Sequence, residues 1–263
     1  MADPPEKLLR FRPPSEYTLE NLRKGQIWFS KPISFNDPFD CAVRVVDAEN
    51  ISEEAYWELF RHFQEMIGRP DLLEKQCVRN GQLTDRFKIR ARDGFRDAYE
   101  EQMQKMLHQR GAVCFSAVSP DHQDSILQWS HYADGHKGIC LEFDTDSSLF
   151  QEGEVFQVRY YRSVPLIEPY EAMTSGEGVL EPMVTTKADC WEYEREWRLY
   201  HMEGDRPRGY ATGCLKAVYL GCEVDVDFRE EVESILQGSS TELYEVQRSE
   251  KQFRLQAESV EIE

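Results

Sequence analysis

The chain has 263 residues, and its 49 acidic and 31 basic side chains give a formal net charge of −18. This length predicts one or two domains, and we expect a single domain over residues 1–263. With 40% apolar and 12% aromatic residues, the chain can build a packed core and is not expected to be disordered. Its negative charge argues against general affinity for nucleic acid or anionic membranes, because phosphate groups bind to cationic surfaces.

The sequence also limits the setting of the protein. No stretch approaches ~18 uncharged apolar residues, and the first residues lack the apolar segment of a secretory signal. We therefore expect a cytoplasmic protein without a membrane span. The 7 cysteines are odd in number and form no C-x-x-C pair, which favours reduced, mostly buried thiols over a disulfide framework or a zinc ribbon.

The first half of the chain predicts strands, then helices. Expected are a strand at 8–12, a helix at 16–24 capped by Ser15, a strand at 27–29 and a polar turn at 34–40. Residues 52–110 carry apolar side chains at helical spacing and are predicted to form a helical insert. Within it, residues 79–110 hold eight basic and five acidic side chains, a bias that makes nucleic acid a candidate partner.

The second half returns to strands. Expected are strands at 112–116, 138–143, 155–161, 196–201 and 217–221, a short helix at 124–134 and a loop with one helix at 168–190. Residues 222–263 should form an acidic end, with a helix at 228–237 and strands at 243–247 and 253–262. The irregular mixture predicts an α+β fold, a curved, mostly antiparallel sheet with the helical insert on its side. We expect 8–12, 112–116, 138–143 and 196–201 in one sheet system.

Two polar–aromatic clusters lie near the start of the chain. In a strand, Arg10 and Arg12 share one face, and two adjacent guanidinium groups suit a phosphate or pyrophosphate. The alternative is an exposed edge strand with salt-bridged arginines. In the segment 28–40, Asp37 before Pro38 predicts a structural turn, whereas Asn36 can present its amide to a ligand.

Two further clusters lie in the second half. His131 and Tyr132 are expected at a pocket wall, or as a structural histidine and its neighbour. No metal site is expected, because His131 and His136 are five residues apart and no acidic third ligand accompanies them. In an extended segment, Glu192, Glu194 and Glu196 would share one face and raise at least one pKa unless cations neutralise them. The alternative is a solvated edge strand.

Several segments resemble a bacterial family catalogued as a domain of unknown function. They are RFRP, TLENLRKGQIWFSKPISFNDPFDC, CFS, WSHYADGHKGICLEF and EREWRLY, which span residues 8–221. More distantly, the order of elements is similar to the ADP-ribosyltransferase superfamily, whose Arg–Ser–Glu branch places an Arg, a Ser and a (Gln/Glu)-x-Glu motif on successive strands. The matching residues are Arg10 or Arg12, Ser116 or its rival Ser30, and Glu196 with Glu194. The full Ser-Thr-Ser motif is missing, since Ala117 and Val118 follow Ser116.

This resemblance implies an enzyme that cleaves the nicotinamide–ribose bond of NAD and transfers ADP-ribose to a macromolecular acceptor, in phage defence or a toxin system. Glu196 would stabilise the oxocarbenium-like transition state, and Glu194 would position or deprotonate the acceptor. The arginines would hold the pyrophosphate of NAD. The binding residues implied beside them are Ser30, Asn36, His131 and three aromatic candidates for stacking, Tyr132, Trp28 and Phe29.

Two other functions stay open at this point. One is a non-catalytic nucleotide- or ligand-binding regulatory module that uses the same pocket. The other is a nuclease or phosphodiesterase with Asp37, His131 and Glu196 as acid–base groups.

Overall fold

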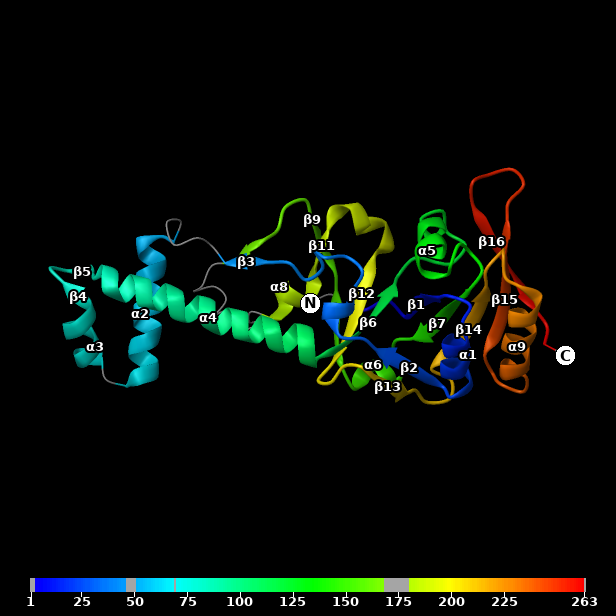
Figure 1. Cartoon of the computed structure of the whole chain (residues 1–263), viewed down its shortest axis with the longest axis horizontal. Coiled ribbons are helices and arrows are strands. Elements are labelled where there is room, and N and C mark those ends of the chain that lie inside the picture. The colour runs from blue at the N-terminus through cyan, green and yellow to red at the C-terminus, as the bar shows by residue number, and fades with distance from the viewer. Residues whose placement is uncertain (1–2, 46–50, 69, 168–179, 263) are drawn as a thin grey trace.

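The computed structural model describes residues 3–45, 51–68, 70–167 and 180–262. Its centre is an eight-stranded sheet (Figure 1). All neighbouring strands are antiparallel except β14 and β15. The strand order is β16 (Leu255–Val260), β15 (Glu242–Arg248), β14 (Leu215–Leu220), β7 (Ile139–Asp144), β1 (Lys7–Arg12), β6 (Gly111–Ser116), β12 (Glu196–His201) and β8 (Glu154–Gln157). The predicted α+β class and the shared sheet of 8–12, 112–116, 138–143 and 196–201 are confirmed.

Helices cover both faces of this sheet and fix the direction of the β1 side chains. On one face, Leu8 of β1 packs in a core with residues of α1 (Glu16–Arg23), α6 (Ser148–Gln151) and α9 (Val226–Leu236). On the other face, Leu9 and Phe11 pack with Trp129 of α5 (Ser125–Tyr132). Because side chains alternate along a strand, Arg10 and Arg12 share the side of Leu8. As predicted, Ser15 caps α1 by accepting the Thr18 amide hydrogen.

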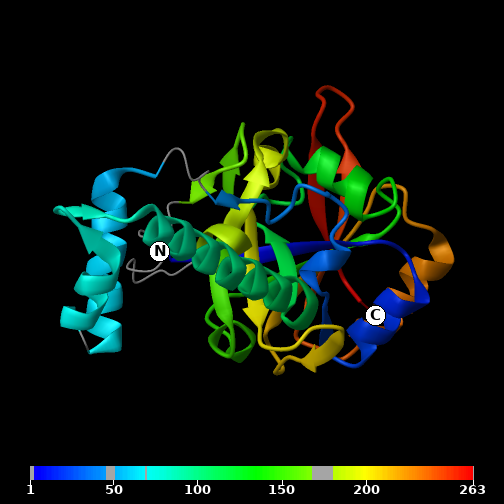
Figure 2. The ribbon, with the colours of Figure 1, turned by 60° about the vertical axis from the view of Figure 1, so that its left-hand side comes forward.

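The predicted helical insert projects from the side of the sheet (Figures 1 and 2). It consists of α2 (Glu53–Ile67), α3 (Pro70–Cys77), a hairpin of β4 (Val78–Arg79) and β5 (Gln82–Leu83), and α4 (Asp85–Gln109). Its outer part has a core of its own around Leu59, Phe60 and Phe87. The inner part of α4 joins a second core, in which Met106 packs with Tyr200 of β12. The insert is therefore anchored to the sheet through α4.

Small additional sheets surround the main one. They pair β2 (Gln26–Phe29) with β13 (Arg206–Gly209), β3 (Arg44–Val45) with β10 (Leu166–Ile167), and β9 (Arg159–Tyr161) with β11 (Thr186–Ala188). The strand expected at 155–161 is thus two strands, β8 and β9, because β9 leaves the main sheet to pair with β11. Of the segment 168–190, residues 168–179 lie outside the described residues, and α8 (Leu180–Thr185) precedes β11.

The segment before β12 differs from the prediction. Asp189–Glu194 forms a 3-10 helix, η3, and Arg195 after it adopts a left-handed conformation with φ 45°. Glu192, Glu194 and Glu196 therefore do not share the face of one extended strand. Glu192 is exposed, whereas Glu194 and Glu196 are buried. No helix in the described part of the chain is long and apolar enough to cross a membrane.

Candidate active site

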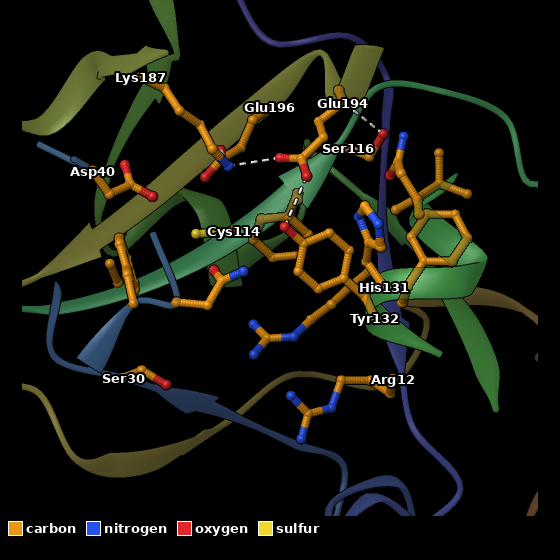
Figure 3. Close-up of a pocket in the computed structure, with 18 of the residues that line it drawn as sticks. Arg12, Ser30, Asp40, Cys114, Ser116, His131, Tyr132, Lys187, Glu194 and Glu196 are labelled. Carbon is orange, nitrogen blue, oxygen red and sulfur yellow. Dashed lines mark hydrogen bonds and ion pairs between the residues drawn. The ribbon is translucent and has the colours of Figure 1, made fainter. Parts of the chain in front are cut away.

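The sheet opens between β1 and β6. Strand β1 pairs with β7 along its whole length, from Lys7 to Arg12, but it meets β6 only where Leu9 faces Ser116. Further along β6, Ala112 exchanges backbone hydrogen bonds with Ser30 instead. A cavity of about 370 Å³ occupies this opening (Figure 3). This volume falls in the range of small-molecule sites, about 300–1,000 Å³.

Most of the predicted site residues line this one cavity, although they are far apart in the sequence. They are Arg10, Arg12, Ser30, Asn36, Ser116, His131, Tyr132, Glu194 and Glu196. Scattered surface residues have no reason to converge in this way, whereas the groups of a binding or catalytic site must do so.

One wall carries two arginines without acidic partners. Among the described residues, neither Arg10 nor Arg12 forms an ion pair, and Nη1 of Arg10 is buried without a hydrogen-bond partner. Burial, together with the adjacent Arg12, lowers the pKa of Arg10. A buried cation without a counter-ion is unfavourable, so this wall is suited to an anionic ligand. The alternative of an exposed, salt-bridged edge strand is therefore wrong.

A glycine just before β7 supports this wall from behind. A Cβ atom added at Gly138 would lie 2.0 Å from the carbonyl oxygen of Arg12. Only glycine allows the chain before β7 to approach β1 so closely. The position of Arg12 therefore depends on the absence of a side chain at Gly138.

The facing wall carries buried carboxylates bound to a lysine. Lys187 of β11 places its Nζ atom 2.6 Å from Oε2 of Glu194 and 2.6 Å from Oε2 of Glu196. Oε1 of Glu194 accepts a hydrogen bond of 2.7 Å from the Tyr132 hydroxyl of α5. Figure 3 shows these side chains directed toward one another around Glu194. The positive charge of Lys187 thus offsets the repulsion between the two carboxylates, as the sequence requires of a cation near crowded glutamates.

A buried arginine binds Glu196 from the other side. The Nε atom of Arg198 donates to Oε1 of Glu196 over 2.7 Å, and its Nη2 atom contacts Oδ1 of Asp40 over 2.5 Å. Burial alone would raise the pKa of Glu196, but Arg198 and Lys187 outweigh it and hold this carboxyl well below its usual range. Glu196 is therefore favoured in its ionised form.

The pKa of Glu194 is shifted in the opposite direction, upward. Burial raises its pKa, and Lys187 opposes this shift only in part. The two glutamates thus differ in their chemistry: one is a fixed negative charge, and the other is a group able to take up a proton. Such divergence within one pair is typical of acid–base sites.

Ser116 connects these walls. Its hydroxyl donates to the carbonyl oxygen of Glu194 over 2.8 Å and accepts the Val118 amide hydrogen over 3.0 Å. It thereby fixes the backbone turn that presents Glu194. Ser30 and Asn36 line the cavity from the segment that follows β2.

The rim of the cavity is aromatic. Nδ1 of His131 lies 3.2 Å from the Tyr193 hydroxyl, and its ring is 5.9 Å from that of Trp191. Trp191 is fixed in turn by its Nε1 donating to Oδ2 of Asp37 over 2.8 Å. Asp37 also accepts the Phe39 amide hydrogen, which is the predicted turn. Asp37 is not one of the described residues that line the cavity.

Two predicted ligand-stacking residues are elsewhere, which corrects the prediction. Phe29 is 1% exposed in the core, because β2 directs it inward against the sheet. Trp28, on the opposite side of β2, lines a small second cavity behind the arginines and packs edge-on against Tyr17. Neither ring reaches the main cavity. His136, five residues after His131, instead stacks on Trp129 with an interplanar angle of 15°.

Sequence reasoning missed Lys187, Arg198 and Asp40. Arg198 lies in the EWR segment, but its position two residues after Glu196 suggested only an alternating strand. The signal for Lys187 was indirect: carboxylates predicted to crowd together require a cation. In the described part of the chain, no three His, Cys, Asp or Glu side chains are arranged to hold a metal ion.

Comparison with known proteins gives one match. Residues 128–199 match the model of a family described as "Protein of unknown function (DUF2971)". This segment runs from α5 to β12 and includes Tyr132, Lys187, Glu194 and Glu196, so it supplies the carboxylate wall of the cavity. The arginine wall lies outside it. No curated protein and no solved structure matches the chain.

Proposed function

We propose that the chain is an ADP-ribosyltransferase-like enzyme, which cleaves the nicotinamide–ribose bond of NAD and transfers ADP-ribose to a macromolecular acceptor. The observation that carries this proposal is the distribution of charge in the cavity. Arg10 and Arg12, which form no ion pair within the described part of the chain, make up one wall, and the buried pair Glu194 and Glu196 lies on another. NAD combines an anionic diphosphate with a ribose that becomes cationic as its bond to nicotinamide breaks.

In this proposal each wall has its own task. Arg10 and Arg12 bind the diphosphate, because paired guanidinium groups match phosphate oxygens in charge and geometry. Tyr132 and His131 provide the aromatic surface beside the carboxylates. The order Arg10, Ser116, Glu196 along successive strands also agrees with the similarity to the Arg–Ser–Glu branch, with Ser116 rather than Ser30 next to the carboxylates.

The reaction uses the difference between the two glutamates. As the ribose C1′–N bond breaks, its electron pair leaves with nicotinamide, and positive charge develops at C1′. The fixed charge of Glu196 favours this state electrostatically. The acceptor then forms a bond to C1′, and its proton passes to Glu194, whose raised pKa makes it the better proton acceptor.

We propose the helical insert as the element that selects the acceptor. In α4, Arg86 and Arg90 are exposed and, among the described residues, form no ion pair. The second part of the insert, residues 79–110, with eight basic and five acidic side chains, thus carries local positive charge on a chain of net charge −18. Nucleic acid is the acceptor class that this charge favours. A cytoplasmic setting in phage defence or a toxin system stays part of the proposal.

A specific observation favours a second candidate. Glu196 is 3% exposed, and both of its carboxylate oxygens are already bound to cations. A carboxylate held in this way is also compatible with a regulatory module that binds a nucleotide without turnover. A phosphodiesterase is less favoured, because Asp37 is engaged by Trp191 and its own turn.

Thermal unfolding with separate ligand parts tests the proposal. NAD at ~100 times its Kd should stabilise the protein by roughly 2.7 kcal/mol. ADP, which retains the diphosphate, should also raise the Tm, whereas nicotinamide alone should have a smaller effect. A protein whose Tm does not respond to millimolar NAD would contradict both the enzyme and the NAD-binding module.

A further inference from the structure

Lys187 belongs to the cavity wall, but the proposed reaction assigns it no task. It is 4% exposed and reaches the cavity from β11, outside the main sheet. Its partner across the β9–β11 pair is Tyr160, whose hydroxyl accepts the backbone amide hydrogen of Glu196 over 2.7 Å. This small sheet therefore delivers two side chains to the start of β12.

The cations are divided unequally between the two glutamates. Glu196 is bound by both Arg198 and Lys187. Glu194 contacts Lys187, which among the described residues is its sole ion-pair partner. The neighbouring Arg195 points outward and pairs with Asp124. Removal of Lys187 would consequently leave Glu196 with a counter-ion and Glu194 with none.

From this asymmetry we propose that Lys187 is the positioning residue for Glu194, which it holds against the Tyr132 hydroxyl in the ionised form that accepts a proton. The inference rests on the proposed function for the role of Glu194 as proton acceptor. Lys187 itself is no candidate for nucleophile or base. Although burial lowers its pKa, Glu196 and Glu194 outweigh this and raise the pKa above the usual value, so the amine stays protonated.

The surroundings of Glu194 explain why one lysine matters. The groups that face this carboxylate are Lys187 of β11, Glu196 of β12, Tyr132 of α5, Tyr160 of β9 and Tyr193 of η3. Burial and the charge of Glu196 both favour the protonated form of Glu194, while Lys187 and the hydrogen bond from Tyr132 favour the ionised form. Without Lys187, a neutral hydrogen bond alone would oppose burial and like-charge repulsion.

Stability alone does not account for such an arrangement. Buried ion pairs are often no more stabilising than apolar residues of similar volume. Here the lysine also lies 5.1 Å from the centre of the Trp191 ring, on the side of the aromatic rim. A charged network maintained at a cavity wall points to the chemistry of that wall.

The test is a titration of Glu194 followed by 13C NMR of the protein labelled at the glutamate side-chain carboxyls. Glu194→Gln identifies the signal. Lys187→Met keeps the length of the side chain but removes its charge, and should raise the pKa of Glu194 by about 1–3 units. Lys187→Arg, the matched control, should leave it near the wild-type value. The inference is wrong if Glu194 titrates at the same or a lower pH in Lys187→Met.

A double variant covers the case in which Lys187→Met does not fold. If Lys187→Met does not fold, the double variant Lys187→Met/Glu194→Gln should restore folding, because no unpaired carboxylate remains at that position. If the double variant is equally unstable, Lys187 serves the fold and the inference fails. The titration needs no NAD, so the two proposals can fail separately. If the protein releases no nicotinamide but the pKa of Glu194 shifts as expected in Lys187→Met, the proposed enzyme function is wrong and the electrostatic role of Lys187 is supported.

Discussion

Ser116 and Glu196 lie directly opposite each other on β6 and β12, at the point where the sheet opens into the cavity. On the other side of β6, Leu9 of β1 faces the same serine. The register of three strands thereby brings the arginine wall and the carboxylate wall to the two sides of one opening. The site is a product of strand pairing rather than of a contiguous motif.

The fixed charge of Glu196 can be removed with little change in shape. In Glu196→Gln, nicotinamide release should fall by about 10²–10³, as for the loss of one preorganised electrostatic group, while the Kd for NAD changes little. The variant also leaves Arg198 and Lys187 with fewer counter-ions, at a stability loss of up to about 3–5 kcal/mol.

Steady-state kinetics should therefore be measured at a temperature at which circular dichroism shows a folded variant. Glu192→Gln is the matched control, since Glu192 is exposed. Equal turnover in Glu196→Gln and Glu192→Gln would remove Glu196 from the mechanism.

Arg10 is expected to contribute to NAD binding while it lowers the stability of the unliganded protein. A buried donor without a partner is unfavourable by about 1–3 kcal/mol, so Arg10→Met should have a Tm at or above that of the wild type without NAD. It should also lose the NAD-dependent increase in Tm. Arg206→Met, at an exposed arginine paired with Glu203, should keep that increase. A large loss of stability in unliganded Arg10→Met would show a structural role instead.

Gly138 offers a test of the support behind Arg12. In Gly138→Ala, the added methyl group would overlap the Arg12 carbonyl and displace β1. We expect a lower Tm and weaker NAD binding by calorimetry. Gly94→Ala is the control, because nothing lies within 4 Å of the added Cβ on α4, and alanine should stabilise that helix by roughly 1 kcal/mol. Unchanged NAD affinity in Gly138→Ala would show that Arg12 does not contribute to NAD binding.

The pH dependence of turnover should report on Glu194. The Tyr132 hydroxyl lowers the pKa of this carboxyl, which burial raises. Tyr132→Phe removes the hydrogen bond, so the pKa of Glu194 rises. Because a base acts in its ionised form, the acidic limb of kcat/KM should move to higher pH, and activity should fall more at pH 6 than at pH 8. Tyr193→Phe, the control, should not move the acidic limb. A shift of the acidic limb to lower pH in Tyr132→Phe would contradict the role of Glu194 as the base.

Local patterns in the sequence predicted the strands that carry the site. The segments that become β1, β6, β7 and β12 each hold apolar side chains with strong strand propensity. They were recognisable without their partners. Arg10, Glu196 and Tyr132 were likewise visible as polar groups beside such segments.

Other features depend on contacts that local sequence does not encode. Asp189–Glu194 is a 3-10 helix because its turn is fixed from outside, by Ser116 bonding to the Glu194 carbonyl and by Trp191 bonding to Asp37. Lys187 lies in a strand, Thr186–Ala188, too short to give a periodic pattern. The sequence cannot separate a stacking role of Phe29 from a core role, because aromatic residues suit both and only burial distinguishes the two.

The release of nicotinamide from NAD tests the central claim most directly. Proton NMR of NAD incubated with the purified protein follows the free nicotinamide without labels or coupled enzymes. We predict slow release by the wild type, faster release with a suitable acceptor, and little release by Glu196→Gln or Arg10→Met. The contradicting result is a wild-type protein that NAD stabilises against unfolding but that releases no nicotinamide, even with nucleic acid or protein acceptors present. That result would rule out the proposed enzyme activity and favour a nucleotide-binding module.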